Sequence, residues 1–92
     1  MEANIMREQP KYRKVYVDVF ALMRHDGTLL PRGFVWEDGE KYKIDRVRHA
    51  TPAASTKVGG RGMRYTVVVG GQEQYLYREE DDRWFMEAPV YR

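Results

Sequence analysis

The sequence predicts an all-β fold, either a small SH3-like meander barrel or a strongly bent antiparallel sheet of five to six short strands. Three observations support this prediction. Apolar and polar residues alternate in short runs, the pairs Asp38-Gly39 and Gly70-Gly71 separate such runs as hairpin turns do, and no segment has helical periodicity. A flat open sheet is disfavoured because so short a chain would have to protect its edges.

The length of 92 residues is that of one domain with one modest core. Hydrophobic residues make up 42% and charged residues 33% of the chain, which argues against a disordered protein. Residues 1–12 are mostly polar and lack periodicity. We therefore expect a flexible N-terminal tail over residues 1–12 and a single β-barrel-like domain over residues 13–92.

The first expected strand covers residues 14–23, where the alternation is clean. One of its faces is wholly apolar and is expected in the core; it consists of Val15, Val17, Val19, Ala21 and Met23. Residues 25–28 are expected to form a turn in which Gly27 adopts a positive φ. Pro31 interrupts the next apolar run, and because proline cannot donate to a central ladder, we expect an edge, a bulge or a corner there.

A hairpin is predicted within residues 33–48. If Asp38 and Gly39 are the two central residues of a type I′ turn, Trp36 lies opposite Lys41. One face of the hairpin would then carry two aromatic and two basic side chains, namely Phe34, Trp36, Lys41 and Lys43. The other face would carry Val35, Tyr42 and Ile44. A β-bulge near Asp45-Arg46 is expected, because Val47 would otherwise lie on the wrong side of the strand.

The second half of the chain predicts a long loop followed by a meander. Residues 50–63 lack strand periodicity and are expected to form the loop. A second two-residue hairpin at Gly70-Gly71 would place Tyr65 opposite Leu76 and Thr66 opposite Tyr75. An acidic turn at residues 80–82 is expected to lead into a last short strand over residues 83–87, which Pro89 ends.

Charge is distributed unevenly along the sequence. Residues 41–64 carry seven basic residues against one acidic residue, a net charge of +6. Residues 71–92 carry three basic residues against six acidic ones, a net charge of −3. Such an asymmetry can mark a binding face for an acidic partner. Alternatively, the two halves lie side by side in one sheet and neutralise each other, and the sequence leaves both interpretations open.

Two features of the basic half suggest contact with nucleic acid. Residues 57–64 combine cations with glycines whose backbone amides could approach a phosphate. The expected face of aromatic and lysine side chains is typical of surfaces on which single-stranded nucleic acid stacks its bases. The candidate nucleic-acid-binding residues are Lys41, Lys43, Arg46, Arg48, Lys57, Arg61, Arg64 and Trp36. The alternatives are a plain hairpin connection at the glycines and a core position for Phe34 and Trp36.

No pattern in the sequence is typical of an enzyme, a metal site or a cofactor site. The chain has no cysteine, its two histidines are His25 and His49, and its one serine is Ser55. We therefore expect a non-enzymatic binding module without metal or cofactor. Neither a signal peptide nor an apolar span of ~20 residues is present, so we expect a cytoplasmic protein with no membrane partner. The alternative function is a protein-interaction or self-assembly module that uses exposed aromatics, such as Tyr75 and Tyr77, and free sheet edges.

The chain also resembles a family of small all-β bacterial proteins from the Firmicutes. The resemblance covers residues 14–87. It rests on the stretches 15–19, 35–39 and 42–47, and on the shorter matches at 52–55, 64–66 and 83–85. No activity is established for that family, so the resemblance implies no cofactor, partner or site residue.

Overall fold

The computed structural model describes residues 11–52 and 62–90, and these residues form eight strands. The strands are β1 (Lys11–Tyr16), β2 (Asp18–Met23), β3 (Leu29–Val35), β4 (Lys41–Lys43), β5 (Arg46–Pro52), β6 (Gly62–Val69), β7 (Gln72–Glu79) and β8 (Trp84–Val90). This part of the chain holds no helix, and hence none that could cross a membrane. The prediction of an all-β fold is confirmed.

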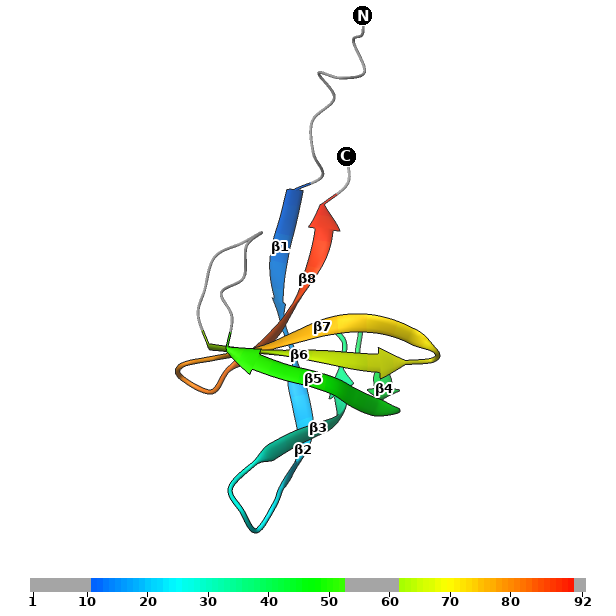
Figure 1. Cartoon of the computed structure of the whole chain (residues 1–92). Coiled ribbons are helices and arrows are strands. Elements are labelled where there is room, and N and C mark those ends of the chain that lie inside the picture. The colour runs from blue at the N-terminus through cyan, green and yellow to red at the C-terminus, as the bar shows by residue number, and fades with distance from the viewer. Residues whose placement is uncertain (1–10, 53–61, 91–92) are drawn as a thin grey trace, which may run out of the picture.

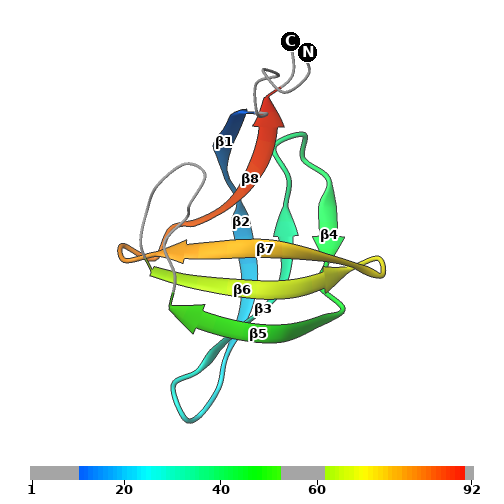
Figure 2. The same cartoon turned by 45° about the horizontal axis from the view of Figure 1, so that its top comes forward.

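The strands form two antiparallel sheets. The larger sheet has the order β1-β8-β7-β6-β5, and the smaller one has the order β2-β3-β4. Figure 1 shows that the larger sheet is strongly bent, because β5, β6 and β7 run together across the molecule while β1 and β8 turn away from them. Figure 2 shows β2, β3 and β4 behind β5, β6 and β7. The sheets do not close into a barrel, so the bent-sheet form of the prediction describes the molecule.

Two long strands divide between the sheets, which is why the described strands outnumber the five to six predicted. The strand that contains β1 and β2 changes sheet at Val17, whose N–H donates to the carbonyl oxygen of Trp84 at 3.0 Å. The strand that contains β4 and β5 changes sheet at Ile44 and Asp45. The N–H of Ile44 donates to the carbonyl oxygen of Arg32 in β3 at 3.0 Å. The N–H of Asp45 donates to the carbonyl oxygen of Val68 in β6 at 2.7 Å.

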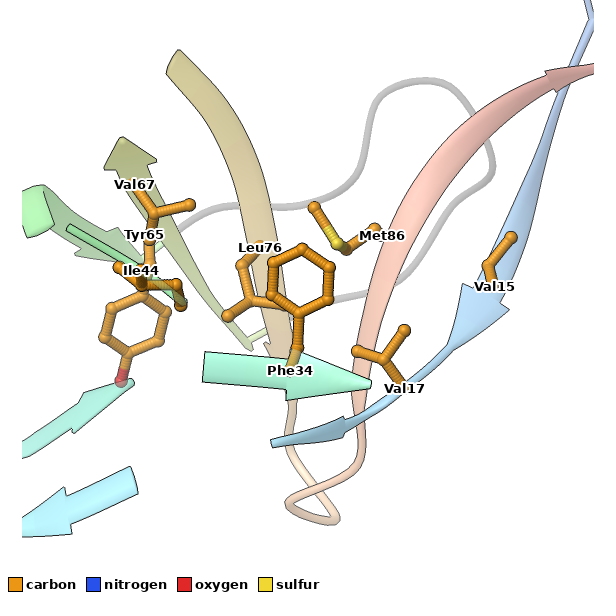
Figure 3. Close-up of a cluster of buried hydrophobic side chains, with 8 residues drawn as sticks. All are labelled: Val15, Val17, Phe34, Ile44, Tyr65, Val67, Leu76 and Met86. Carbon is orange, nitrogen blue, oxygen red and sulfur yellow. The ribbon is translucent and has the colours of Figure 1, made fainter. Parts of the chain in front are cut away.

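The hydrophobic core lies between the two sheets. Its buried members belong to strands of both sheets or, for Val17 and Ile44, to the points where the chain changes sheet. Figure 3 draws them; they are Val15, Val17, Phe34, Ile44, Tyr65, Val67, Leu76 and Met86. Val67 and Leu76 have no exposed surface. The sheets are therefore joined both by continuous strands and by a shared apolar interior.

Three of the hairpin turns have the same design. Each is a three-residue loop, at residues 25–27, 37–39 and 80–82, closed by a backbone hydrogen bond between the flanking residues. In each loop the central aspartate accepts a hydrogen bond from the N–H two residues later, as Asp38 does from Glu40 at 2.9 Å. The third residue of each loop has a positive φ, and Gly27 does so as predicted. The acidic turn at residues 80–82 is likewise confirmed.

The predicted register of the β3–β4 hairpin is wrong by one residue. The loop contains three residues rather than two, because Gly39 alone has a positive φ while the Asp38 side chain caps the turn. Phe34 therefore lies opposite Tyr42, and Val35 lies opposite Lys41. A one-residue slip moves side chains to the opposite face, so Lys41 and Lys43 do not share a face with Phe34 and Trp36.

The second predicted hairpin is confirmed, whereas the predicted core face of the first strand is only partly correct. The two-residue turn at Gly70-Gly71 is confirmed, as are the pairs Tyr65–Leu76 and Thr66–Tyr75. Ala21 and Met23 were expected in the core but are exposed, because β2 runs beyond the larger sheet after Val19. Pro31 lies at a register shift of the β2–β3 ladder, in agreement with the expected bulge.

Val47 packs against the core as expected, although the irregularity that allows this lies elsewhere than predicted. The strand changes sheet at Ile44–Asp45, and the register of β5 on β6 shifts between Val47 and His49.

The strand ends also differ from the predicted boundaries. Strand β1 begins at Lys11, inside the expected tail; residues 1–10 lie outside the described residues. Strand β5 reaches Pro52 and β6 begins at Gly62, so both enter the expected loop at 50–63, of which residues 53–61 are not described. Pro89 does not end β8, because it pairs with Tyr12 of β1 at a point where β7 no longer pairs with β8.

Candidate functional site

An open cleft lies between the β3–β4 hairpin and the end of the β6–β7 hairpin. Its volume is about 420 Å³. We call it the aromatic cleft; its lining residues are Phe34, Trp36, Tyr42, Val69, Gly70, Gln72, Gln74, Met86 and Glu87. A concave site with apolar walls and a few polar groups is typical of ligand-binding pockets.

Aromatic side chains of the β3–β4 hairpin form one wall of the aromatic cleft. Phe34 is buried and stacks on Tyr42, with ring centroids 5.4 Å apart and an angle of 23° between the ring planes. Tyr42 is 41% exposed, so part of its ring is open to solvent. Trp36 is half-buried at the last position before the turn, and its backbone N–H donates to the backbone carbonyl oxygen of Glu40 at 2.8 Å. The wall thus consists of a buried ring and two rings that a ligand can reach.

The opposite wall is held in place by Asp45. Its carboxylate accepts a hydrogen bond from the N–H of Gly70 at 2.9 Å, which ties the turn of the β6–β7 hairpin to the junction of β4 and β5. Gln72 and Gln74 contribute side-chain amides that can both donate and accept hydrogen bonds. One wall of the cleft is therefore aromatic, and the opposite wall can form hydrogen bonds with polar groups of a ligand.

Four of the candidate cations lie on one continuous stretch of chain beside the cleft. We call Lys41, Lys43, Arg46 and Arg48 the basic edge; all four are exposed, and β4 and β5 are edge strands of their sheets. Arg48 forms an ion pair with Glu73 at 3.0 Å, and both side chains are about half exposed. Within the described residues, no ion pair is found for Lys41, Lys43 or Arg46. These three cations are available to an anionic partner.

Arg64 lies on the face of the larger sheet that points away from the core. Its guanidinium carbon is 4.6 Å from the ring centroid of Tyr75, and its Nε atom is buried without a hydrogen-bond partner. Arg46 lies on this same face. It pairs with Val68, which follows Arg64 by four residues on β6 and therefore lies on the same side of the sheet. Lys57 and Arg61, the other candidate cations, lie outside the described residues.

A row of four aromatic rings crosses this same outer face, and the sequence analysis found only two of them, Tyr75 and Tyr77. The rings belong to Tyr75, Tyr77, Phe85 and Tyr16, in that order, with successive centroids 6.5, 4.8 and 6.0 Å apart. The alternation of residues in β1, β7 and β8 shows which aromatic residues share a side of their own strand. Only the pairing of β1 with β8 brings Tyr16 beside Phe85. Tyr75 is exposed as expected, but the expectation for Tyr77 is wrong, because Tyr77 and Phe85 are buried although no described strand covers this face.

Charged groups cover the aromatic row. Lys14 lies 4.6 Å from the ring centroid of Phe85 and forms an ion pair with Glu79. The hydrogen bond from Lys14 holds the pKa of Glu79 below its usual value, and Glu79 in turn raises the pKa of Lys14. Tyr16 also donates to Glu79, at 3.0 Å. Burial raises the pKa of the Tyr77 hydroxyl, which donates to Glu87 at 3.3 Å.

Acid is expected to weaken the fold partly through Glu79. Because the pKa of Glu79 is lowered in the folded state, its charged form stabilises the protein above the usual value of 4.5. This contribution is lost as the pH falls through the lowered pKa. The Glu79→Gln variant should therefore be less stable than the wild type at pH 7 and should lose less stability between pH 7 and about pH 3.

Urea unfolding at the two pH values measures this effect. Glu73→Gln is the matched control, because its ion pair with Arg48 is exposed and should contribute little. The role of Glu79 would be refuted if Glu79→Gln lost as much stability as the wild type on acidification.

Neither histidine contributes to the aromatic cleft. Within residues 11–52 and 62–90, no group of three or more His, Cys, Asp or Glu side chains is placed to hold a metal ion. The site that can be built from these residues is therefore an aromatic cleft next to a basic edge. No protein-family model, curated protein or solved structure matches the chain.

Proposed function

We propose that the protein binds single-stranded nucleic acid, with a base in the aromatic cleft and phosphates along the basic edge. The observation that carries this proposal is the position of Tyr42. Its ring forms a wall of the cleft, while its two neighbours in the chain, Lys41 and Lys43, are exposed cations on the other side of the same strand. One bound strand could therefore contact both features.

The cleft supplies what an unpaired base needs. Trp36 and Tyr42 offer ring faces for stacking, which contributes ~1–3 kcal/mol per base. Gln72 and Gln74 can pair with the donors and acceptors on a base edge. A base in a duplex has no free face, so the cleft favours single strands over duplexes.

The basic edge supplies the electrostatic contribution. Alternate residues of a strand lie ~6.6 Å apart, so Lys41 and Lys43 form a short row of cations on β4. Arg46 and Arg48 follow on β5, after the chain has changed sheet. Long lysine side chains can reach around an edge strand toward a backbone that passes the cleft. Nucleic acid as the partner also fits the cytoplasmic location that the sequence predicts.

Salt-titrated binding of labelled single-stranded and duplex oligonucleotides tests the proposal. Removal of both lysines in the Lys41→Ala/Lys43→Ala variant should weaken binding ~10-fold at low salt and reduce the salt slope by about two. Tyr42→Ala should weaken binding roughly 5- to 100-fold with little change in the salt slope, because it removes stacking rather than charge.

The matched control is Lys11→Ala/Arg32→Ala, which removes the same charge at exposed positions outside the basic edge. Quenching of Trp36 fluorescence in a Trp84→Phe background gives a second signal from the cleft. The proposal would be wrong if no oligonucleotide bound at low salt, or if the control weakened binding as much as the loss of Lys41 and Lys43.

A further inference from the structure

Strand β2 is an edge strand with an unusual number of exposed apolar side chains. Phe20, Leu22 and Met23 are 54%, 47% and 64% exposed. β2 pairs with β3 on one side and has no strand on its other side within the described residues. Figure 1 shows that the β2–β3 hairpin projects away from the larger sheet, so a partner can reach this edge.

The free edge of β2 offers backbone groups for pairing. The N–H of Arg24 points toward β3, where it donates to Thr28 at 2.8 Å. Because successive residues of a strand direct their backbone groups to opposite sides, those of Val19, Ala21 and Met23 point away from β3. Ala21 lies opposite Pro31, which has no N–H to offer, in agreement with this alternation.

The other sheet edges carry features that oppose pairing. Strand β5 has two arginines, an irregular register and Pro52, and β4 is three residues long with two lysines. The outer strand of the larger sheet, β1, carries Lys11, Arg13 and Lys14. Charge, proline and irregularity are the usual protection of free edges. Strand β2 carries no charge and no proline between Val19 and Met23, and the extra residue of its irregular pairing with β3 lies in β3.

We propose that a second copy of this chain pairs with β2 in antiparallel fashion, with the twofold axis at Ala21. In this register Asp18 lies opposite Arg24 of the second copy, and Arg24 lies opposite its Asp18. Phe20 lies opposite Leu22, and Val19 lies opposite Met23. The two small sheets would then form one continuous six-stranded sheet whose new central strands are the two copies of β2.

Charge complementarity selects this register. Asp18 and Arg24 are both exposed, and within the described residues neither has an ion-pair partner in its own chain. The two neighbouring registers with the same backbone alternation would place Asp18 opposite Leu22 or opposite Asp26. Only the proposed register pairs opposite charges at both ends of the strand and apolar residues between them.

Sedimentation equilibrium at ~10–500 μM tests the proposal, because an interface of one strand pair is small and should give a micromolar Kd. Asp18→Arg alone, or Arg24→Asp alone, places like charges opposite each other twice in the dimer and should raise the Kd at least ~10-fold. The doubly reversed variant, Asp18→Arg/Arg24→Asp, should restore the wild-type Kd. Glu40→Arg is the matched control, with the same change of charge at an exposed turn.

Ala21→Pro gives an independent readout of backbone pairing. It removes an N–H that points away from β3, so the monomer should keep its fold, as circular dichroism can show, while the dimer is lost. A wild-type protein that stays monomeric at 500 μM would overturn the proposal. So would a dimer that tolerates Ala21→Pro, or single charge reversals that the double variant does not rescue.

Discussion

The Gly62→Ala variant is expected to lose ~3 kcal/mol or more of folding free energy, one of the largest effects of any single substitution in the described part of the chain. Gly62 has a φ of +132°, which residues with a side chain rarely adopt. A Cβ atom there would lie 2.0 Å from the carbonyl oxygen of Arg78 and 3.1 Å from the Cα atom of Glu79. These are backbone atoms of the paired strand β7, so the clash cannot be relieved by rotating a side chain.

Thermal or urea unfolding measures this loss, which should lower the melting temperature by roughly 10–25 °C in a domain of this size. Gly70→Ala and Gly71→Ala are matched controls. Both glycines have a positive φ, of 56° and 82°, but no atom lies within 4 Å of a Cβ built on either. These two variants should lose only ~1–2 kcal/mol of folding free energy, which is what a left-handed conformation costs an alanine. An equal loss in Gly62→Ala and Gly70→Ala would show that the contact with Arg78 does not matter.

The hairpins show how much of the fold local chemistry can predict. At Gly70-Gly71 the two-residue turn was predicted together with its register, because two glycines adopt positive φ at both positions without strain and have no side chain that could cap a longer loop. At Asp38-Gly39 the same reasoning gave the wrong register. Aspartate can cap a three-residue loop with its carboxylate, and that loop needs only one positive φ. An Asp-Gly pair is compatible with both turns, so the sequence does not decide between them.

That one-residue difference determines what the candidate site is. The predicted register placed Phe34 and Trp36 beside the lysines on one surface. The observed register stacks Phe34 on Tyr42 and turns both toward the space between the sheets, where they line the aromatic cleft. Trp36, one of the candidate residues from the sequence, lines this cleft, and so does Tyr42, which the predicted register assigned to the other face of the hairpin.

Long-range pairing was the other unpredictable part. Nothing in the alternation of residues 14–23 says that the strand changes partner at Val17, because the change depends on β8, more than sixty residues later. The same pairing brings Tyr16 beside Phe85. Contacts between strands distant in sequence create both the core and the outer aromatic row, and local patterns carry no information about them.

Phe85→Ala is expected to destabilise the protein by ~3–5 kcal/mol, as a truncation in a hydrophobic core does. Phe85 lies on the outer face of the larger sheet, yet its side chain is 1% exposed. Its ring stacks on Tyr77 at 4.8 Å with 6° between the planes, Tyr16 packs edge-on against it at 6.0 Å, and the Lys14 ammonium lies over it at 4.6 Å. Removing the ring would leave a cavity among groups that β1, β7 and β8 hold apart.

The neighbouring ring of Tyr75 provides the sharpest contrast for this prediction. Tyr75 belongs to the same row but is 49% exposed and rests on Arg64, so Tyr75→Ala should lose ~1 kcal/mol or less. Phe85→Leu should fall between the two variants, because it keeps most of the buried volume. Urea unfolding of the three variants would therefore measure whether this face acts as a second small core. Equal losses in Tyr75→Ala and Phe85→Ala would mean instead that the row is held together only by surface contacts, and that the interior between the sheets alone sustains the fold.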